Sequence, residues 1–249
     1  HHIVGYPKAA DLRERLYRWL TRAFIKYDSS KAKAVRVVNQ RQVPEFLIEA
    51  GVPKEKIIYI PSLYIDLDIF RPMDLEKRYD LIFVGRLVKN KGIDLFLEAV
   101  KRLDCKAAII GDGPLKEKIK FKIKNRKFKI DMYGWVEAQQ EVTKLLNQSK
   151  ILVMVSYNEG GPRVVGEAMA CGVPVLATPV GIVPDIIKNG ESGEITDWKA
   201  EDIAEKGSTL LKNKDKYEKY RQMAIRIASQ FEKKSAIKNY ALKIQNLAS

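Results

Sequence analysis

Residues 151–172 read ILVMVSYNEGGPRVVGEAMACG, and the order of their residue types predicts the fold. The run Ile151–Val155 is short and wholly apolar, as expected of a strand buried on both faces. The pair Gly160–Gly161 then permits a tight turn, and Pro162 suits the first position of a helix, because its missing N–H would be unpaired there. Gly172 is the usual kind of residue just past a helix end. Strand, glycine turn and helix together indicate one unit of an α/β sheet.

The same unit recurs between Arg78 and Leu211. Short apolar runs alternate there with amphipathic patterns, such as the stripe from Ile93 to Leu103 that repeats at i, i+3, i+4 and i+7. Strand followed by helix, repeated about five times, implies right-handed crossovers. We therefore expect an α/β fold with a doubly wound, Rossmann-like parallel sheet. Its other strands are expected at Leu81–Val84, Ala107–Ile110, Ile130–Tyr133 and Val175–Ala177.

Smaller elements flank this sheet on both sides. The pattern before it predicts helices at Asp11–Tyr27 and Pro44–Ala50 and strands at Ala34–Val38 and Ile57–Ile60. These elements are too few to close a separate domain, so residues 1–72 are expected to form part of an N-terminal α/β domain and a hinge. Residues 73–230 are expected to form the main domain. Residues 231–249 are expected to form a C-terminal helix that crosses back to the N-terminal part.

The chain of 249 residues is basic, with 45 Lys and Arg against 31 Asp and Glu and a formal net charge of +14. This excess favours anionic partners, namely phosphates, an anionic membrane surface or nucleic acid. Nucleic acid ranks last, because the sequence has neither a basic sheet interleaved with aromatic residues nor a recognition-helix motif. No apolar run approaches the roughly 18–20 residues that span a bilayer, and no signal peptide is recognisable. We therefore expect a cytoplasmic protein.

Metal and disulfide chemistry are not expected. Cys105 and Cys171 are too few for a disulfide scaffold, and no cluster of His, Cys and carboxylate residues has metal-ligand spacing. Cys171 is expected to be a core residue, Trp135 and Trp198 are expected to pack, and His1 and His2 are assigned no role.

Two glutamates bracket the glycine turn that opens the 162–172 helix. Glu159 lies at the mouth of the turn and Glu167 lies about a turn and a half into the helix. Such a junction presents free N–H groups and the positive end of the helix dipole to an anion. A carboxylate beside a phosphate site is poorly placed to bind phosphate but well placed to bind sugar hydroxyls. The alternative is an ordinary turn with two solvated glutamates.

A second glycine-containing turn, Gly85–Gly92, follows the first strand of the sheet. It carries Arg86 and Lys91 at a strand's carboxyl end, where open α/β sheets bind their ligands. Arginine offers a bidentate fork for phosphate and lysine offers a point charge. The alternative is a solvent-facing loop. Neither this turn nor those at Gly111–Pro114 and Tyr133–Val136 has the spacing of a dinucleotide site or a phosphate loop.

Together these turns resemble the donor-binding half of a family 4-type retaining glycosyltransferase with the GT-B fold. The resemblance spans about residue 34 to the C-terminus, and its most specific part is the block from Glu159 to Gly172. The sequence departs from the family's usual pattern in two places. Gly161 and Gly166 stand where the family often has bulky apolar residues, and Ser62-Leu63 stands where it usually has Asn-Gly.

The resemblance implies a role for each residue of these turns. Arg86 and Lys91 would neutralise the donor diphosphate, and Glu159 would hold the donor sugar, so these three residues would carry catalysis. Glu167 would bind the ribose hydroxyls. The remaining donor-binding residues would be Gly85, Gly111, Gly113, Val136, Gly160, Gly161, Pro162, Arg163, Val164 and Val165, with Val136 near the base and the N–H groups around Val164 and Val165 near the phosphates.

The activity implied is transfer of a hexosyl unit, with retention of configuration and without a metal or cofactor. The donor would be a UDP-, GDP- or ADP-sugar, and the acceptor a saccharide or a lipid-linked molecule. A related sugar-nucleotide epimerase and a nucleotide-binding fragment without turnover stay open as alternatives.

Two basic segments stand apart from these turns. Arg15, Arg18, Arg22 and Lys26 line the edge of the first helix, which is expected either to pack in the domain or to lie on anionic lipid. The run Lys116–Lys129 is expected to be a solvated helix and loop.

Overall fold

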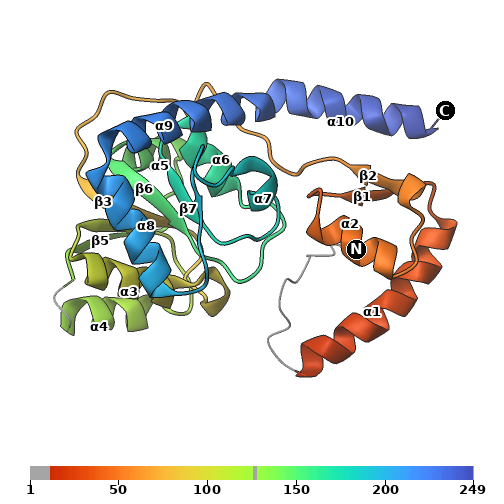
Figure 1. Cartoon of the computed structure of the whole chain (residues 1–249), viewed down its shortest axis with the longest axis horizontal. Helices are drawn as coiled ribbons and strands as arrows, with labels where there is room; N and C mark the ends of the chain where they lie inside the picture. The colour runs from red at the N-terminus through yellow and green to blue at the C-terminus, as the bar shows by residue number, and fades with distance from the viewer. Residues whose placement is uncertain (1–11, 126–127, 249) are drawn as a thin grey trace.

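The structure is a computed structural model that describes residues 12–125 and 128–248 (Figure 1). His1 and His2 lie outside the described residues, as do the side chains of Arg15 and Arg18. Within the described part, the centre of the molecule is a parallel sheet of six strands in the order β5-β4-β3-β6-β7-β8. The strands are β3 (Tyr79–Val84), β4 (Ala107–Ile110), β5 (Ile130–Gly134), β6 (Ser149–Met154), β7 (Val175–Ala177) and β8 (Glu194–Ile195).

Helices cover both faces of this sheet, because successive strand residues point to opposite sides. Leu81 and Phe83 of β3 join one core with α3 (Ile93–Leu103), α4 (Lys116–Asn125) and α8 (Ala200–Lys212). Ile82 joins the other core with α5 (Gln139–Asn147), α6 (Arg163–Ala170) and α9 (Lys214–Ala228). The predicted doubly wound α/β fold is therefore confirmed, and all five predicted strands are present.

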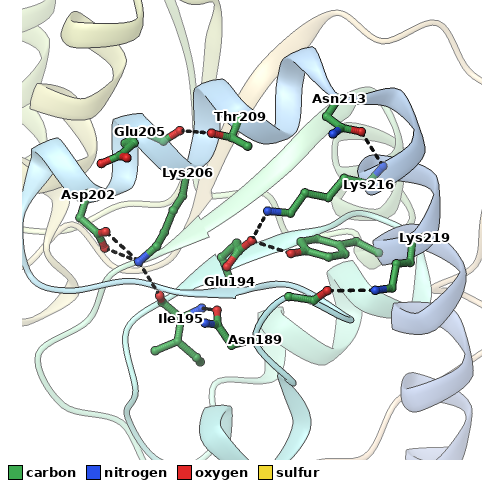
Figure 2. Close-up of polar contacts among 12 residues, drawn as sticks. Asn189, Glu194, Ile195, Asp202, Glu205, Lys206, Thr209, Asn213, Lys216 and Lys219 are labelled. Carbon is green, nitrogen blue, oxygen red and sulfur yellow. Dashed lines mark hydrogen bonds and ion pairs between the residues drawn. The ribbon is translucent and has the colours of Figure 1, made fainter.

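The sixth strand, β8, is absent from the sequence prediction because it is only two residues long and begins with a charged residue. Glu194 is nevertheless buried, at 6% exposed. Figure 2 shows how α9 reaches it: Lys216 Nζ lies 2.7 Å from its carboxylate. The Tyr220 hydroxyl donates to the same oxygen at 2.5 Å. A buried carboxylate is tolerated here because a cation and a hydroxyl both satisfy it.

A smaller α/β body precedes the sheet. Its elements are α1 (Leu12–Lys31), β1 (Val35–Val37), α2 (Gln42–Glu49), the 3-10 turn η1 (Lys54–Lys56) and β2 (Ile57–Tyr59). β1 and β2 pair in parallel, and a small core that includes Val37, Val43 and Leu47 lies against them. The predicted strands are found, whereas α1 extends four residues past the predicted end at Tyr27.

The C-terminal helix connects the two bodies. After α9 and the 3-10 turn η3 (Ser229–Phe231), α10 (Lys233–Ala248) runs along the top of Figure 1 toward the smaller body. Lys243 Nζ donates to the Tyr59 carbonyl at 2.9 Å, and the Arg36 guanidinium lies over the Tyr240 ring. Closer to the sheet, the Gln40 N–H donates to the Asp185 carboxylate at 2.8 Å.

Candidate functional site

A pocket of about 300 Å³ lies at the carboxyl ends of β3 and β6. These neighbouring strands mark the point where the strand order reverses, which is where open α/β sheets bind their ligands. Seven of the predicted site residues line it: Gly85, Lys91, Glu159, Gly161, Pro162, Arg163 and Val164. The lining also includes Phe83, Val84, Val153, Met154 and Ser156. The first four of these are strand residues, which the sequence pattern predicts only as core residues.

Two of the charged residues that line the pocket, Lys91 and Glu159, pair with each other. Lys91 Nζ forms a hydrogen-bonded ion pair with Glu159 Oε1, and the two side chains are 28% and 14% exposed. Lys91 is placed there by Gly92, which closes the preceding 3-10 turn in the left-handed region at φ +68°. A Cβ at Gly92 would collide with the Val155 carbonyl oxygen, so only glycine allows the two turns to approach so closely.

Glu167 is the second of the two glutamates that bracket the glycine turn. It sits in α6, and its side chain is only 14% exposed, with Oε1 3.6 Å from Arg163 Nη2. Burial raises the pKa of the Glu167 carboxyl, and the nearby Arg163 charge opposes that rise. A largely buried carboxylate whose nearby cation lies 3.6 Å away has acceptor capacity left for hydroxyl groups.

The remaining predicted residues do not line the pocket: Arg86, Gly111, Gly113, Val136, Gly160, Val165 and Glu167. Arg86 is exposed and follows Gly85 directly in the same turn. Gly111 lies so close to that turn that a Cβ would collide with the Gly85 carbonyl oxygen. The Val165 N–H already donates to the Pro162 carbonyl at 3.1 Å, so it is engaged within the first turn of α6.

The connection 61–66 packs directly against α6 and its preceding turn. A Cβ at Gly161 would collide with the Ser62 hydroxyl oxygen. A Cβ at Gly166 would lie 2.9 Å from both Leu63 Cδ1 and Ile65 Cδ1. The two unusual glycines therefore leave room for the unusual Ser62-Leu63, and the two departures from the family pattern compensate for each other in space.

Several other predictions can be compared with the structure. Cys171 is buried in the core, and burial raises its pKa to about 12, which disfavours the thiolate. Trp198 packs against the core and its ring also stacks on Tyr157, at 6.5 Å between centroids. The packing prediction is wrong for Trp135, which is 72% exposed because it follows the edge strand β5.

Within the part of the chain that the structure describes, no group of three or more His, Cys, Asp or Glu side chains gathers to hold a metal ion. None of the helices in that part is both long and apolar enough to cross a bilayer. Large apolar side chains do lie exposed on α1, among them Trp19 at 69% and Phe24 at 71%.

Residues 67–227 match the family model described as glycosyl transferases group 1. An uncharacterised glycosyltransferase of Methanocaldococcus jannaschii is 35% identical over 136 residues, which cover 54% of this chain and 38% of that protein. A Campylobacter jejuni enzyme is 28% identical over 224 residues, which cover 87% of this chain and 60% of that protein. Its name is GalNAc-alpha-(1->4)-GalNAc-alpha-(1->3)-diNAcBac-PP-undecaprenol alpha-1,4-N-acetyl-D-galactosaminyltransferase. The chain thus spans well under two thirds of the length of these relatives.

Among solved structures, Anabaena HepE in complex with UDP-glucose superimposes with a TM-score of 0.79 at 20% identity. The match covers 94% of this chain and 69% of that one. At this level of identity the likeness shows the fold.

Proposed function

Because this chain is a member of the glycosyl transferases group 1 family, we propose that it forms the nucleotide-sugar-binding part of a glycosyltransferase. The reaction is transfer of a hexosyl unit from a nucleoside-diphosphate sugar, with retention of configuration and without a metal. The observation that carries the proposal is the Lys91–Glu159 pair in the pocket at the switch point of the sheet. It puts a phosphate-binding cation and a hydroxyl-binding carboxylate side by side.

Each charged residue then has a task. Lys91, with Arg86 of the same Gly85–Gly92 turn, stabilises the negative charge that develops on the departing diphosphate, as a metal ion would in other enzymes. Glu159 accepts hydrogen bonds from the donor sugar near its reacting carbon. Glu167 accepts hydrogen bonds from the ribose hydroxyls. The partial burial of its side chain limits competition from water for these hydrogen bonds.

We propose UDP as the nucleotide and a lipid-linked saccharide as the acceptor. The support for UDP is the UDP-glucose complex of HepE, which has the same fold. The support for the acceptor is the name of the Campylobacter relative, whose substrate is linked to undecaprenol diphosphate.

Isothermal titration calorimetry with UDP, GDP and ADP, in buffer containing EDTA, tests the donor site. One nucleotide should bind at least tenfold more tightly than the others, a difference of about 1.4 kcal/mol. Equal and negligible binding of all three would refute the proposal. Where turnover with an acceptor is found, the anomeric configuration of the product by NMR decides retention.

A peripheral position on an anionic membrane is a second proposal, carried by the exposed side of α1. Trp19, Phe24 and Tyr27 are all at least 60% exposed, and Arg22 and Lys26 lie between them. Aromatic and basic residues on one helix favour the interface of an anionic bilayer. In a flotation assay with vesicles of phosphatidylcholine and phosphatidylglycerol, the parent protein should float with the vesicles. The variant Trp19→Ser/Phe24→Ser should stay in the lower fractions. Equal flotation of the two proteins would contradict the membrane proposal. So would equal flotation of the parent protein with vesicles that contain phosphatidylglycerol and with vesicles that lack it.

A further inference from the structure

We propose that Ser156 and Trp198 are positioning residues for Glu159, which fix one of its carboxylate oxygens so that the other faces the ligand. This inference rests on the proposed function, because it assigns the second oxygen to the donor sugar. It concerns residues that the sequence pattern did not place in the site.

Ser156 contacts Glu159 directly. It follows β6, is 1% exposed and lines the pocket. Its hydroxyl donates to Glu159 Oε1 at 2.8 Å, and Lys91 donates to that same oxygen. Within the part of the chain that the structure describes, both hydrogen bonds of this carboxylate fall on Oε1. Since each carboxylate oxygen can accept two hydrogen bonds, Oε2 keeps its full capacity for a ligand hydroxyl.

Ser156 is itself held from two neighbouring strands. Its carbonyl oxygen accepts a hydrogen bond from Thr178 Oγ1 at 2.7 Å, and Thr178 follows β7. The same oxygen accepts from Trp198 Nε1 at 3.0 Å, and Trp198 follows β8. The turn that carries Glu159 is therefore tied to the ends of the next two strands of the sheet. Such fixed support is what keeps a reacting group within a fraction of an ångström of its productive position.

The Trp198 ring adds a second constraint on the same turn. It stacks on the ring of Tyr157, the residue after Ser156, with an interplanar angle of 11°. Replacing Trp198 with phenylalanine would keep an aromatic ring for this stack while removing the N–H donor and part of the ring system. The variant therefore tests the hydrogen bond to Ser156 together with a small loss of packing.

The chain offers a matched control in Ser149. It is as buried as Ser156, and its hydroxyl also makes a single hydrogen bond, to the Leu145 carbonyl at 2.7 Å. Ser149 lies at the other end of β6 and does not line the pocket. Ser149→Ala and Ser156→Ala therefore remove the same chemical group from equally buried places, and only one of them should affect Glu159.

The experiment compares the Kd of UDP with the Kd of UDP-glucose and UDP-N-acetylglucosamine by calorimetry. The parent should bind one of the UDP-sugars more tightly than UDP. Ser156→Ala should weaken that UDP-sugar about tenfold while the Kd of UDP changes less than twofold. Trp198→Phe should weaken it about threefold, and Ser156→Thr, which keeps the hydroxyl, should restore the parent value. Ser149→Ala should leave the ratio of the two Kd values unchanged, whatever it does to the melting temperature.

Different outcomes separate this inference from the function on which it rests. Equal losses of UDP and UDP-sugar affinity in Ser156→Ala, or no loss in either, would overturn the positioning role and leave the nucleotide site standing. So would a further change of the Kd ratio when Ser156→Ala is added to Glu159→Ala, because Ser156 would then act without Glu159. A parent that binds no nucleotide overturns the proposed function and this role with it.

Discussion

Replacing Glu159 with glutamine should tighten the binding of free UDP, even though Glu159 belongs to the proposed donor site. In the structure its carboxylate is paired with Lys91, the cation that a diphosphate would need. UDP must therefore displace an anion that the protein itself supplies. Glutamine keeps a hydrogen-bond acceptor of the same size and removes the competing charge.

The structure sets the size of the effect. Glutamine keeps a hydrogen bond from the Lys91 ammonium to an amide oxygen but removes the attraction between two opposite charges, so it should weaken the internal pair by about 1 kcal/mol. The low exposure of the two side chains, 28% and 14%, limits screening by solvent. If all of this difference passes to the ligand, the Kd of UDP falls about fivefold.

Calorimetric titration of UDP into the parent, Glu159→Gln and Glu167→Gln measures this directly. Glu167→Gln is the matched control, because it makes the same chemical change eight residues along at the same exposed fraction of 14%, yet removes a ribose contact. The two variants should shift the Kd in opposite directions. If Glu159→Gln binds UDP no more tightly than the parent, the carboxylate does not compete for Lys91 and the reasoning is refuted.

Three further predictions concern stability as well as binding. Glu167→Gln should weaken the binding of UDP about tenfold, yet it should raise the melting temperature at pH 8 and not at pH 4. Burial raises the folded-state pKa of this carboxyl, so the folded protein loses stability as the pH rises through that pKa. An equal change of the melting temperature at both pH values would contradict this. Gly166→Leu should lower the free energy of unfolding in urea by about 1–3 kcal/mol, because the new side chain overpacks the core. Adding Leu63→Ala should recover part of this loss, whereas additive losses would exclude a contact between positions 63 and 166. Glu194→Ala should lower the free energy of unfolding in urea by about 3–5 kcal/mol, because it leaves the Tyr220 hydroxyl and Lys216 without their partner. The control Glu201→Ala, at an exposed ion pair, should lower it by less than about 1 kcal/mol. Similar losses in the two variants would argue against a buried pair at Glu194.

β3, β4, β6 and β7 were predictable because nearly all of their residues are buried, so each strand reads as a largely apolar run. The pocket at their ends was predictable in part for the same reason: a strand's carboxyl end can be located once the strand is recognised. Glycines mark the turns there, as Gly92 does, where the close approach of another backbone excludes a side chain. β8 escaped prediction because its burial depends on Lys216 and Tyr220, which come from a helix some twenty residues later.

The support behind Glu159 could not be predicted from the sequence. Ser156, Thr178 and Trp198 each follow a different strand, and nothing in their spacing indicates a shared hydrogen bond. They meet only because β6, β7 and β8 are neighbours in the sheet, a fact that requires the strand order. Periodicity identifies strands, whereas tertiary contacts of this kind depend on how the strands are arranged.

The departures from the family pattern at Gly161, Gly166 and Ser62-Leu63 also depend on tertiary contacts that the sequence pattern does not indicate. In the family pattern that the sequence resembles, a larger side chain is usual where Gly166 stands and glycine is usual where Leu63 stands. In the structure the Leu63 methyl occupies the space that a side chain at 166 would need, so the interior between α6 and the 61–66 connection stays filled. The same holds at the pocket, where the Ser62 hydroxyl occupies the space of a side chain at 161. The packed volume of each contact is therefore filled from the other side, and beside Gly161 it is filled by a polar residue from a segment that precedes the sheet.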